Sequence, residues 1–230
     1  MVERTVKPSE NDKWNKEATY KSWVGLIENY SLAGAIQFNL LTALGMRQEH
    51  YLLDIGCGSF RGGKMSIVYL LPEHYYGIEP IKWVVEEGIK NELGNDLVLL
   101  KKPTIDYNGD FTATVFDRKF DYILAQSIFS HASKEQIRRC INQVSQTMHK
   151  NSMFAFTYSI GQNNYEGDTW VFPQCVKFTP NFIKKTCEEN GLVYNAIKWP
   201  HQGQQWVVAT KPECTKIIPN FSGVTWFKEK

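Results

Sequence analysis

A short apolar run leads directly into a glycine-rich turn in the stretch YLLDIGCGSFRGG, residues 51–63. Asp54 lies two residues before Gly56, and a second acid, Glu79, ends the next apolar run. Glycines such as Gly56 and Gly58 can adopt positive φ and bring bare backbone N–H groups against a ligand. A carboxylate at the end of the second strand can accept hydrogen bonds from ribose hydroxyls. Together these residues predict a site for a ribose-containing cofactor.

The spacing of the glycines separates this turn from the nicotinamide-binding fingerprint. That fingerprint reads G-x-G-x-x-G and carries its acid about twenty residues later. Here Arg61 stands where the third glycine would be, and Asp54 lies inside the turn itself. A nicotinamide oxidoreductase is therefore a disfavoured alternative, which quenching of tryptophan fluorescence by NADH would revive.

Five apolar runs alternate with helical patterns after residue 45, and this rhythm predicts the elements that must position the turn. Strands are expected near residues 51–55, 75–79, 97–100, 120–126 and 153–158. Helices are expected at residues 62–71, 80–94, 134–149 and 180–189. The runs 192–199 and 205–210 flank a short turn and predict an antiparallel hairpin. The fold class is therefore α/β, a doubly wound, mostly parallel sheet with helices on both faces.

Ligands of such sheets bind outside the carboxyl ends of the strands, where the strand order reverses. This rule is expected to place Asp54, Glu79, the pair Asp110 and Phe111, and Gln126 around one crevice. The turn at residues 200–204 should lie at the same edge, because it follows a strand that runs parallel to the others.

Composition indicates one globular domain that binds a small partner. The chain has 230 residues, of which 43% are hydrophobic and 22% charged, enough for one sizeable core. Its formal net charge is only +2 and its lysines are scattered, so nothing marks a surface for nucleic acid or an anionic membrane. Residues 1–45 read as an arm and helices that could cover a substrate, 46–212 as the core, and 213–230 as a tail.

The five cysteines are widely spaced and form no C-x-x-C pair. An odd number in this arrangement disfavours a disulfide framework and a zinc site, and we expect no metal. The first residues lack the apolar core of a signal peptide, and no apolar run approaches the length needed to span a bilayer. A cytoplasmic location is expected.

The motif residues resemble those of the class I S-adenosylmethionine-dependent methyltransferases. DIGCG, residues 54–58, resembles the first motif of that family, and Glu79 resembles its second. The order of elements is similar to the family's Rossmann-like seven-stranded sheet, whose last strand inserts antiparallel. The resemblance covers roughly residues 45–210. The segments around it, including HQGQQW at residues 201–206, also resemble a bacterial subgroup linked to saccharide or other small-metabolite modification.

The resemblance implies S-adenosyl-L-methionine as cofactor and S-adenosyl-L-homocysteine as product. Asp54 would orient the methionine end, Glu79 the ribose, and Asp110 the adenine amino group, with Asp106 as the alternative to Asp110. The full set of implied cofactor-binding residues is Asp54, Gly56, Cys57, Gly58, Arg61, Glu79, Pro80, Asp110, Phe111 and Gln126. Phe60 stands where many members carry a third glycine, and Gly62 or Gly63 could supply the close packing instead.

Two histidines are candidates for the base that a hydroxyl acceptor requires, His201 in the hairpin turn and His131 after the fourth strand. Five further residues are candidates for substrate binding: Tyr20, Trp23, Tyr158, Tyr165 and Gln202. Tyr165 lies in the long segment 161–177, and loops of that length inside a compact domain are usually functional.

These residues predict methyl transfer to a small-molecule or saccharide acceptor at oxygen. Alternatives are an N- or S-directed small-molecule methyltransferase and a non-catalytic S-adenosylmethionine-binding module. Methylation of nucleic acid is disfavoured, because residues 125–128 read AQSI and lack the Asn/Asp-Pro-Pro-aromatic motif. A metal-assisted methyltransferase is a further alternative, but the sequence near the fourth strand contains no cluster of acids that indicates a metal site. Activity that survives excess chelator would exclude this alternative.

Overall fold

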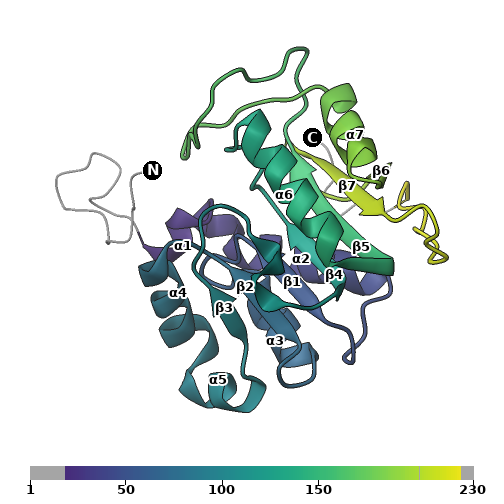
Figure 1. The fold of residues 1–230 in the computed structure, drawn as a ribbon. Coiled ribbons are helices and arrows are strands. Elements are labelled where there is room, and N and C mark those ends of the chain that lie inside the picture. Colours follow the sequence, from purple (N-terminus) through teal and green to yellow (C-terminus); the bar gives the residue numbers. More distant parts are fainter. Residues whose placement is uncertain (1–18, 202, 224–230) are drawn as a thin grey trace. The chain divides into compact units, whose positions relative to one another are not determined.

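The computed structural model describes residues 19–201 and 203–223, and the chain divides into two compact units. The first unit contains residues 47–109 and the described residues before 43, and the second contains residues 43–46 and those from 110 onward. Figure 1 labels the strands and α-helices of each unit.

The first unit consists of parallel strands with helices between them. Its strands are β1 (Leu52–Ile55), β2 (Tyr75–Ile78) and β3 (Thr104–Asp106). Its helices are α1 (Tyr20–Trp23), η1 (Ile27–Asn29), α2 (Tyr30–Ala43), α3 (Gly63–Tyr69), α4 (Lys82–Gly88), the π-helix η2 (Ile89–Leu93) and α5 (Asn95–Lys101). β2 pairs in parallel with β1 and with β3, so that Ile55, Ile78 and Asp106 are neighbours in register. Every residue of β1 is buried, as its apolar run predicts.

The strand predicted at residues 97–100 is wrong. These residues form α5, in which no residue is buried and Leu99 is 73% exposed. A short apolar run cannot distinguish a strand from a helix by its pattern alone. Gly94, at φ 79°, precedes the helix, and Lys102, at φ 48°, ends it before the three-residue strand β3. The third strand exists, but it begins at Thr104.

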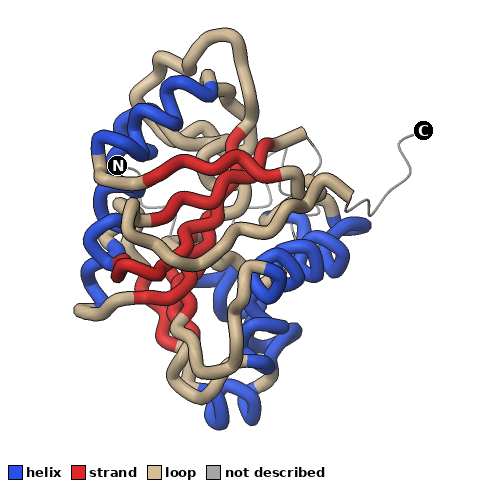
Figure 2. The backbone as a smooth tube through the Cα atoms, turned by 90° about the vertical axis from the view of Figure 1, so that its right-hand side faces the viewer, coloured by secondary structure: helices blue, strands red, loops and turns tan. Residues whose placement is uncertain are grey.

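The second unit carries the strands β4 (Phe120–Ala125), β5 (Met148–Tyr158), β6 (Val193–Ile197) and β7 (Gln205–Thr210). Its helices are η3 (Ala113–Phe116), α6 (Lys134–Thr147) and α7 (Pro180–Glu189). A capping box at Ser133 starts α6, while Thr179 caps α7, which has proline at its start, so local sequence fixes both helix beginnings. Residues 159–179 form a long loop between β5 and α7, drawn in tan in Figure 2.

β4 and β5 are parallel, whereas β7 is antiparallel to both β5 and β6. The seven strands follow the order β3-β2-β1-β4-β5-β7-β6. The predicted fold class, a mostly parallel Rossmann-like sheet with an antiparallel terminal hairpin strand, is confirmed. Among the described residues, no helix has the length and apolar character needed to cross a membrane.

Candidate functional site

The glycine turn is anchored to the end of β2. The backbone N–H groups of Gly56 and Cys57 both donate to the Ile78 carbonyl, at 2.8 and 3.2 Å. Gly56 and Gly58 have φ of 72° and 54°, the left-handed region that glycine enters without steric cost. Pairing of β1 with β2 therefore brings the first and second sequence motifs together.

Phe60 adopts the backbone conformation that a third glycine would supply. Its φ is 62°, and its side chain is fully buried beside Tyr75, with 6.3 Å between ring centroids. A left-handed backbone costs a non-glycine residue about 1–2 kcal/mol, which burial of a phenyl ring can offset. The predicted close packing at Gly63 is also present, since an added Cβ would lie 2.5 Å from the Tyr75 hydroxyl oxygen.

Glu79 is a buried carboxylate held by two backbone N–H groups. Gly58 donates to Oε2 at 3.1 Å and Ile81 donates to Oε1 at 2.9 Å. Within the described part of the chain, Glu79 makes no ion pair. Burial raises the pKa of Glu79 to about 7, although the two N–H donors oppose the shift. A ligand that offers hydroxyl donors or a positive charge would stabilise its ionised form.

Asp54 has a hydrogen-bond partner that the sequence analysis missed. The Tyr75 hydroxyl donates to Asp54 Oδ2 at 2.7 Å, and both residues are buried. Burial raises the pKa of Asp54 to about 6, against the opposing effects of the Tyr75 hydrogen bond and the Arg61 charge. Strand register could have revealed this pair: Asp54 lies opposite Gly77, so Tyr75, two residues before Gly77, points to the same face.

Because of these two carboxylates, we expect the cofactor-free protein to lose stability as the pH rises from about 5 to 7. Their pKa values are raised on folding, from 3.8 to about 6 for Asp54 and from 4.5 to about 7 for Glu79. The folded state therefore holds protons that the unfolded state has released, which favours folding at the acidic end. The Glu79 shift alone corresponds to roughly 3 kcal/mol. Urea unfolding at several pH values measures this, and a free energy of unfolding that stays flat from pH 5 to 7 would contradict it.

The predicted adenine contacts Asp110 and Phe111 belong to the second unit. The Asp110 carboxylate accepts a hydrogen bond from the Thr112 hydroxyl at 2.7 Å and pairs with Arg139 Nη2 at 2.5 Å. These contacts, with Thr112 contributing most, lower the pKa of Asp110. Phe111 has φ 62° and lies 6.5 Å from Trp170 between ring centroids. The alternative acid, Asp106, ends β3 in the first unit, where its carbonyl accepts the N–H of Glu79 at 3.0 Å.

Gln126 and His201 lie together, although 75 residues separate them in the sequence. Gln126 Nε2 is 2.7 Å from His201 Nε2 and 2.5 Å from the Ser127 hydroxyl. Thr157 joins this group, because its hydroxyl accepts the Ser127 N–H at 2.7 Å. The hairpin turn is thus confirmed to lie at the carboxyl end of β4. With the Gln126 amide nitrogen toward the ring, His201 Nε2 accepts this hydrogen bond when the ring proton is on Nδ1.

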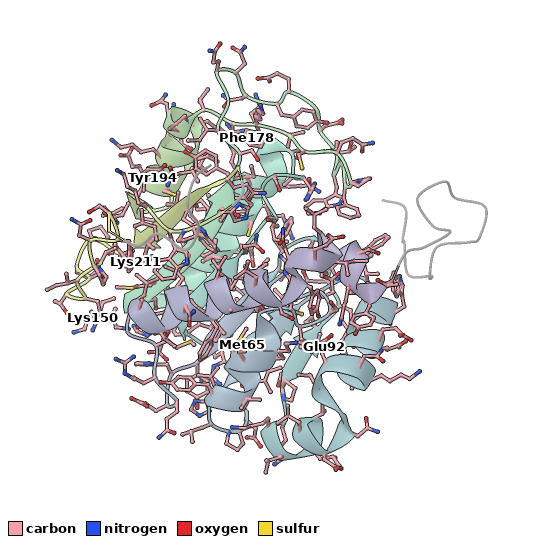
Figure 3. All side chains as sticks on the ribbon, turned by 180° about the vertical axis from the view of Figure 1, so that it is seen from behind. Met65, Glu92, Lys150, Phe178, Tyr194 and Lys211 are labelled. Atoms are coloured by element: carbon pink, nitrogen blue, oxygen red, sulfur yellow. The ribbon has the colours of Figure 1, made fainter. Side chains whose placement is uncertain are left out.

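The other candidates of the second unit have defined partners. His131 Nδ1 donates to the Gln174 carbonyl at 2.7 Å, and its ring touches Trp170 and Phe172. Burial lowers the pKa of His131. The Tyr158 hydroxyl is 3.0 Å from that of Tyr194, labelled in Figure 3, and burial raises the pKa of Tyr158.

Tyr165 belongs to the long loop, and its N–H donates to the Lys177 carbonyl at 3.0 Å. The Tyr165 hydroxyl folds back on its own loop, 2.0 Å from where a Cβ on Gly167 would stand. Gln202, the remaining substrate candidate, lies outside the described residues.

Three candidates of the first unit gather around the start of the described chain. Arg61 donates to the Val24 carbonyl, and burial lowers the pKa of Arg61 to about 10. Tyr20 donates to Glu92, and Trp23 packs edge-on against Trp83 with 5.5 Å between ring centroids. Of the remaining candidates, Cys57 is buried in the glycine turn, and Pro80 directly follows Glu79 in the sequence.

Comparison with solved structures shows the fold that these residues share with known proteins. No protein-family model matches the chain, and no curated protein matches its sequence. Magnesium protoporphyrin IX methyltransferase (ChlM) from Synechocystis PCC 6803, with S-adenosylmethionine bound, matches with a TM-score of 0.62 at 13% identity, over 88% of this chain and 87% of that chain.

Two further solved structures have a similar fold. DesVI from Streptomyces venezuelae has a TM-score of 0.62 at 12% identity, over 85% of this chain and 99% of that chain. The glycopeptide N-methyltransferase MtfA, with S-adenosylhomocysteine bound, has a TM-score of 0.56 at 12% identity, over 78% and 90%. The chain therefore has the fold seen in S-adenosylmethionine-dependent methyltransferases, which confirms the expected resemblance at the level of the fold.

Proposed function

We propose that this chain, which has the methyltransferase fold, transfers a methyl group from S-adenosylmethionine to the oxygen of a small-molecule or saccharide acceptor. The observation that carries the proposal is the pair of buried carboxylates at the glycine turn. Asp54 and Glu79 make no ion pair within the described residues. Burying ionised groups without a partner is costly. A cofactor that carries positive charge and ribose hydroxyls would supply what both lack.

The residues of the first unit fit this cofactor. Glu79 would accept the ribose hydroxyls, since each of its oxygens takes one N–H from the described residues and a carboxylate oxygen can accept a second hydrogen bond. Asp54 Oδ1 takes no hydrogen bond from the described residues and would face the methionine ammonium group, while Tyr75 fixes Oδ2. When bound, the cofactor supplies a methyl group already activated on a sulfonium.

For the adenine amino group we favour Asp106, the alternative to Asp110. Asp106 is the direct backbone neighbour of Glu79, and among the described residues Asn108 engages one of its carboxylate oxygens, Oδ1. The Asp110 carboxylate is already held by Thr112 and Arg139. Asp110, Phe111 and Gln126 stay predicted cofactor contacts. Comparing the cofactor affinities of Asp106→Ala and Asp110→Ala tests which of the two acids binds the adenine amino group.

In the second unit, His201 is the proposed base. As the acceptor oxygen takes the methyl group, its proton would pass to His201 Nε2, the atom that Gln126 and Ser127 now face at 2.7 and 3.3 Å. His131 is the weaker candidate, because its ring packs against Trp170 and Phe172 and burial lowers its pKa, which makes it a weaker base. Tyr20, Trp23, Tyr158 and Tyr165 stay proposed substrate contacts. The five free cysteines support the proposed cytoplasmic location.

Calorimetry with S-adenosylhomocysteine tests the proposal. We expect wild-type protein to bind and Asp54→Ala to bind at least tenfold more weakly, because a charge-assisted contact of about 1.5–3 kcal/mol is lost. Absence of binding, or equal binding by both proteins, would overturn the proposed cofactor site.

A non-catalytic cofactor-binding module is the second candidate function. It is favoured if the protein binds the cofactor but transfers no labelled methyl group to any fraction of a metabolite pool. Labelled products that carry the methyl group on nitrogen would instead favour an N-methyltransferase, the activity named for MtfA.

A further inference from the structure

The segment 19–25, which we call the cap, lies directly on the glycine turn. An added Cβ at Gly58 would stand only 2.5 Å from Val24 Cγ1, so the valine side chain already fills that space. Arg61, at the end of the turn, donates a hydrogen bond from its guanidinium to the Val24 carbonyl. The cap thus touches the backbone that the proposed function assigns to cofactor binding.

The cap has little structure of its own to hold it there. Its helix α1 contains four residues, none of them buried, and is started by a capping box between Thr19 and Ser22. Helices of this length are unstable in isolation, because nucleation is costly and few hydrogen bonds repay it. The position of the cap must therefore come from contacts with the rest of the first unit.

Glu92 provides the most concentrated set of these contacts. Its Oε1 accepts the Tyr20 hydroxyl at 2.9 Å and lies 3.3 Å from Lys21 Nζ, while its Oε2 is 2.5 Å from Lys64 Nζ. Tyr20 and Lys21 belong to the cap, whereas Lys64 belongs to α3, the helix that follows the glycine turn. Figure 3 labels Glu92 beside α1. One carboxylate therefore ties the cap to the helix behind the turn.

The Glu92 cluster differs from an ordinary surface ion pair, because its carboxylate is largely buried and has several donors. The Glu92 side chain is only 7% exposed, although the glutamate belongs to the π-helix η2 near the surface of the unit. Burial acts to raise the pKa of Glu92, but the hydrogen bonds from Lys64 and Tyr20 outweigh it, so the pKa is lowered. A charged acceptor with three donors in a partly dry site is worth more than an exposed pair.

We propose that Glu92 is a positioning residue that holds the cap on the glycine turn and thereby slows release of the cofactor bound there. The inference rests on the proposed function for the identity of that cofactor. Trp23 of the cap packs against Trp83 of α4, so opening of the cap should also change tryptophan fluorescence.

The test compares Glu92→Gln with Glu73→Gln, a control that removes a glutamate from an exposed lysine pair of the same unit. Two quantities are measured: hydrogen exchange of amides 20–25 in the cofactor-free protein, and release of S-adenosylhomocysteine by stopped-flow fluorescence. We expect Glu92→Gln to accelerate both by about tenfold and Glu73→Gln to change neither. Because Glu92→Gln could unfold the chain, Lys21→Met serves as a second variant with a smaller change in the same direction.

The outcomes separate the inference from the proposed function. If wild-type protein binds S-adenosylhomocysteine but Glu92→Gln and Lys21→Met release it at the wild-type rate, the role of Glu92 is overturned. It is equally overturned if exchange in the cap stays unchanged. Failure of the wild-type protein to bind would instead overturn the proposed function, while cap exchange would still report whether Glu92 holds the segment.

Discussion

Replacement of Glu79 by glutamine is expected to weaken S-adenosylmethionine binding about 100-fold, because hydrogen bonds to a charged acceptor contribute roughly 1.5–3 kcal/mol each and two ribose hydroxyls are involved. The amide also fits the turn poorly. Both Glu79 oxygens now accept backbone N–H groups, from Gly58 and Ile81, and a glutamine must set its NH₂ against one of them. The ribose end of the site is therefore lost while the fold of the sheet is retained.

Calorimetry at pH 8, where Glu79 is ionised, measures this loss. Glu86→Gln is the matched control, since Glu86 is an exposed glutamate on the neighbouring helix α4. Glu79→Gln should also lose the part of the pH dependence of the free energy of unfolding that extends to about pH 7, because that part belongs to the Glu79 carboxyl. Binding within threefold of the wild-type value would show that Glu79 is not the ribose contact.

The second large effect is expected for His201→Ala, with kcat lowered by 10²- to 10⁴-fold in methyl transfer to a hydroxyl acceptor, the range typical of general-base catalysis. Gln126 Nε2 and the Ser127 hydroxyl lie 2.7 and 3.3 Å from His201 Nε2, and an acceptor hydroxyl would take the place of these groups. Cofactor affinity should change little, because the loss concerns the proton of the acceptor.

Initial rates with a labelled methyl donor, taken from pH 5.5 to 9, measure this effect. Loss of a base lowers kcat and removes the decline of activity at acidic pH, whereas loss of a binding contact raises KM alone. His149→Ala is the matched control, since His149 pairs with Asp121 at 3.1 Å and is not a candidate. A variant with wild-type kcat would exclude His201 as the base and return attention to His131.

Much of the fold was predictable because its signals are local. Buried apolar runs gave four of the five parallel strands, and capping residues placed the starts of α6 and α7. The strand predicted at residues 97–100 was wrong because an apolar run of four residues fits a helix as well as a strand. Only pairing with β2 identifies Thr104–Asp106 as the edge strand, and that pairing joins residues about thirty positions apart in the sequence.

The sequence by itself determined the glycine turn, with Asp54 before it and Glu79 at the end of the next strand, because positive φ and strand ends are properties of neighbouring residues. Only the tertiary structure supplied the partners: Tyr75 for Asp54, Glu92 for the cap, and Gln126 for His201. Each of these contacts joins residues 21 to 75 positions apart. Side chains so distant meet only through strand register and helix packing, which depend on the folded chain as a whole.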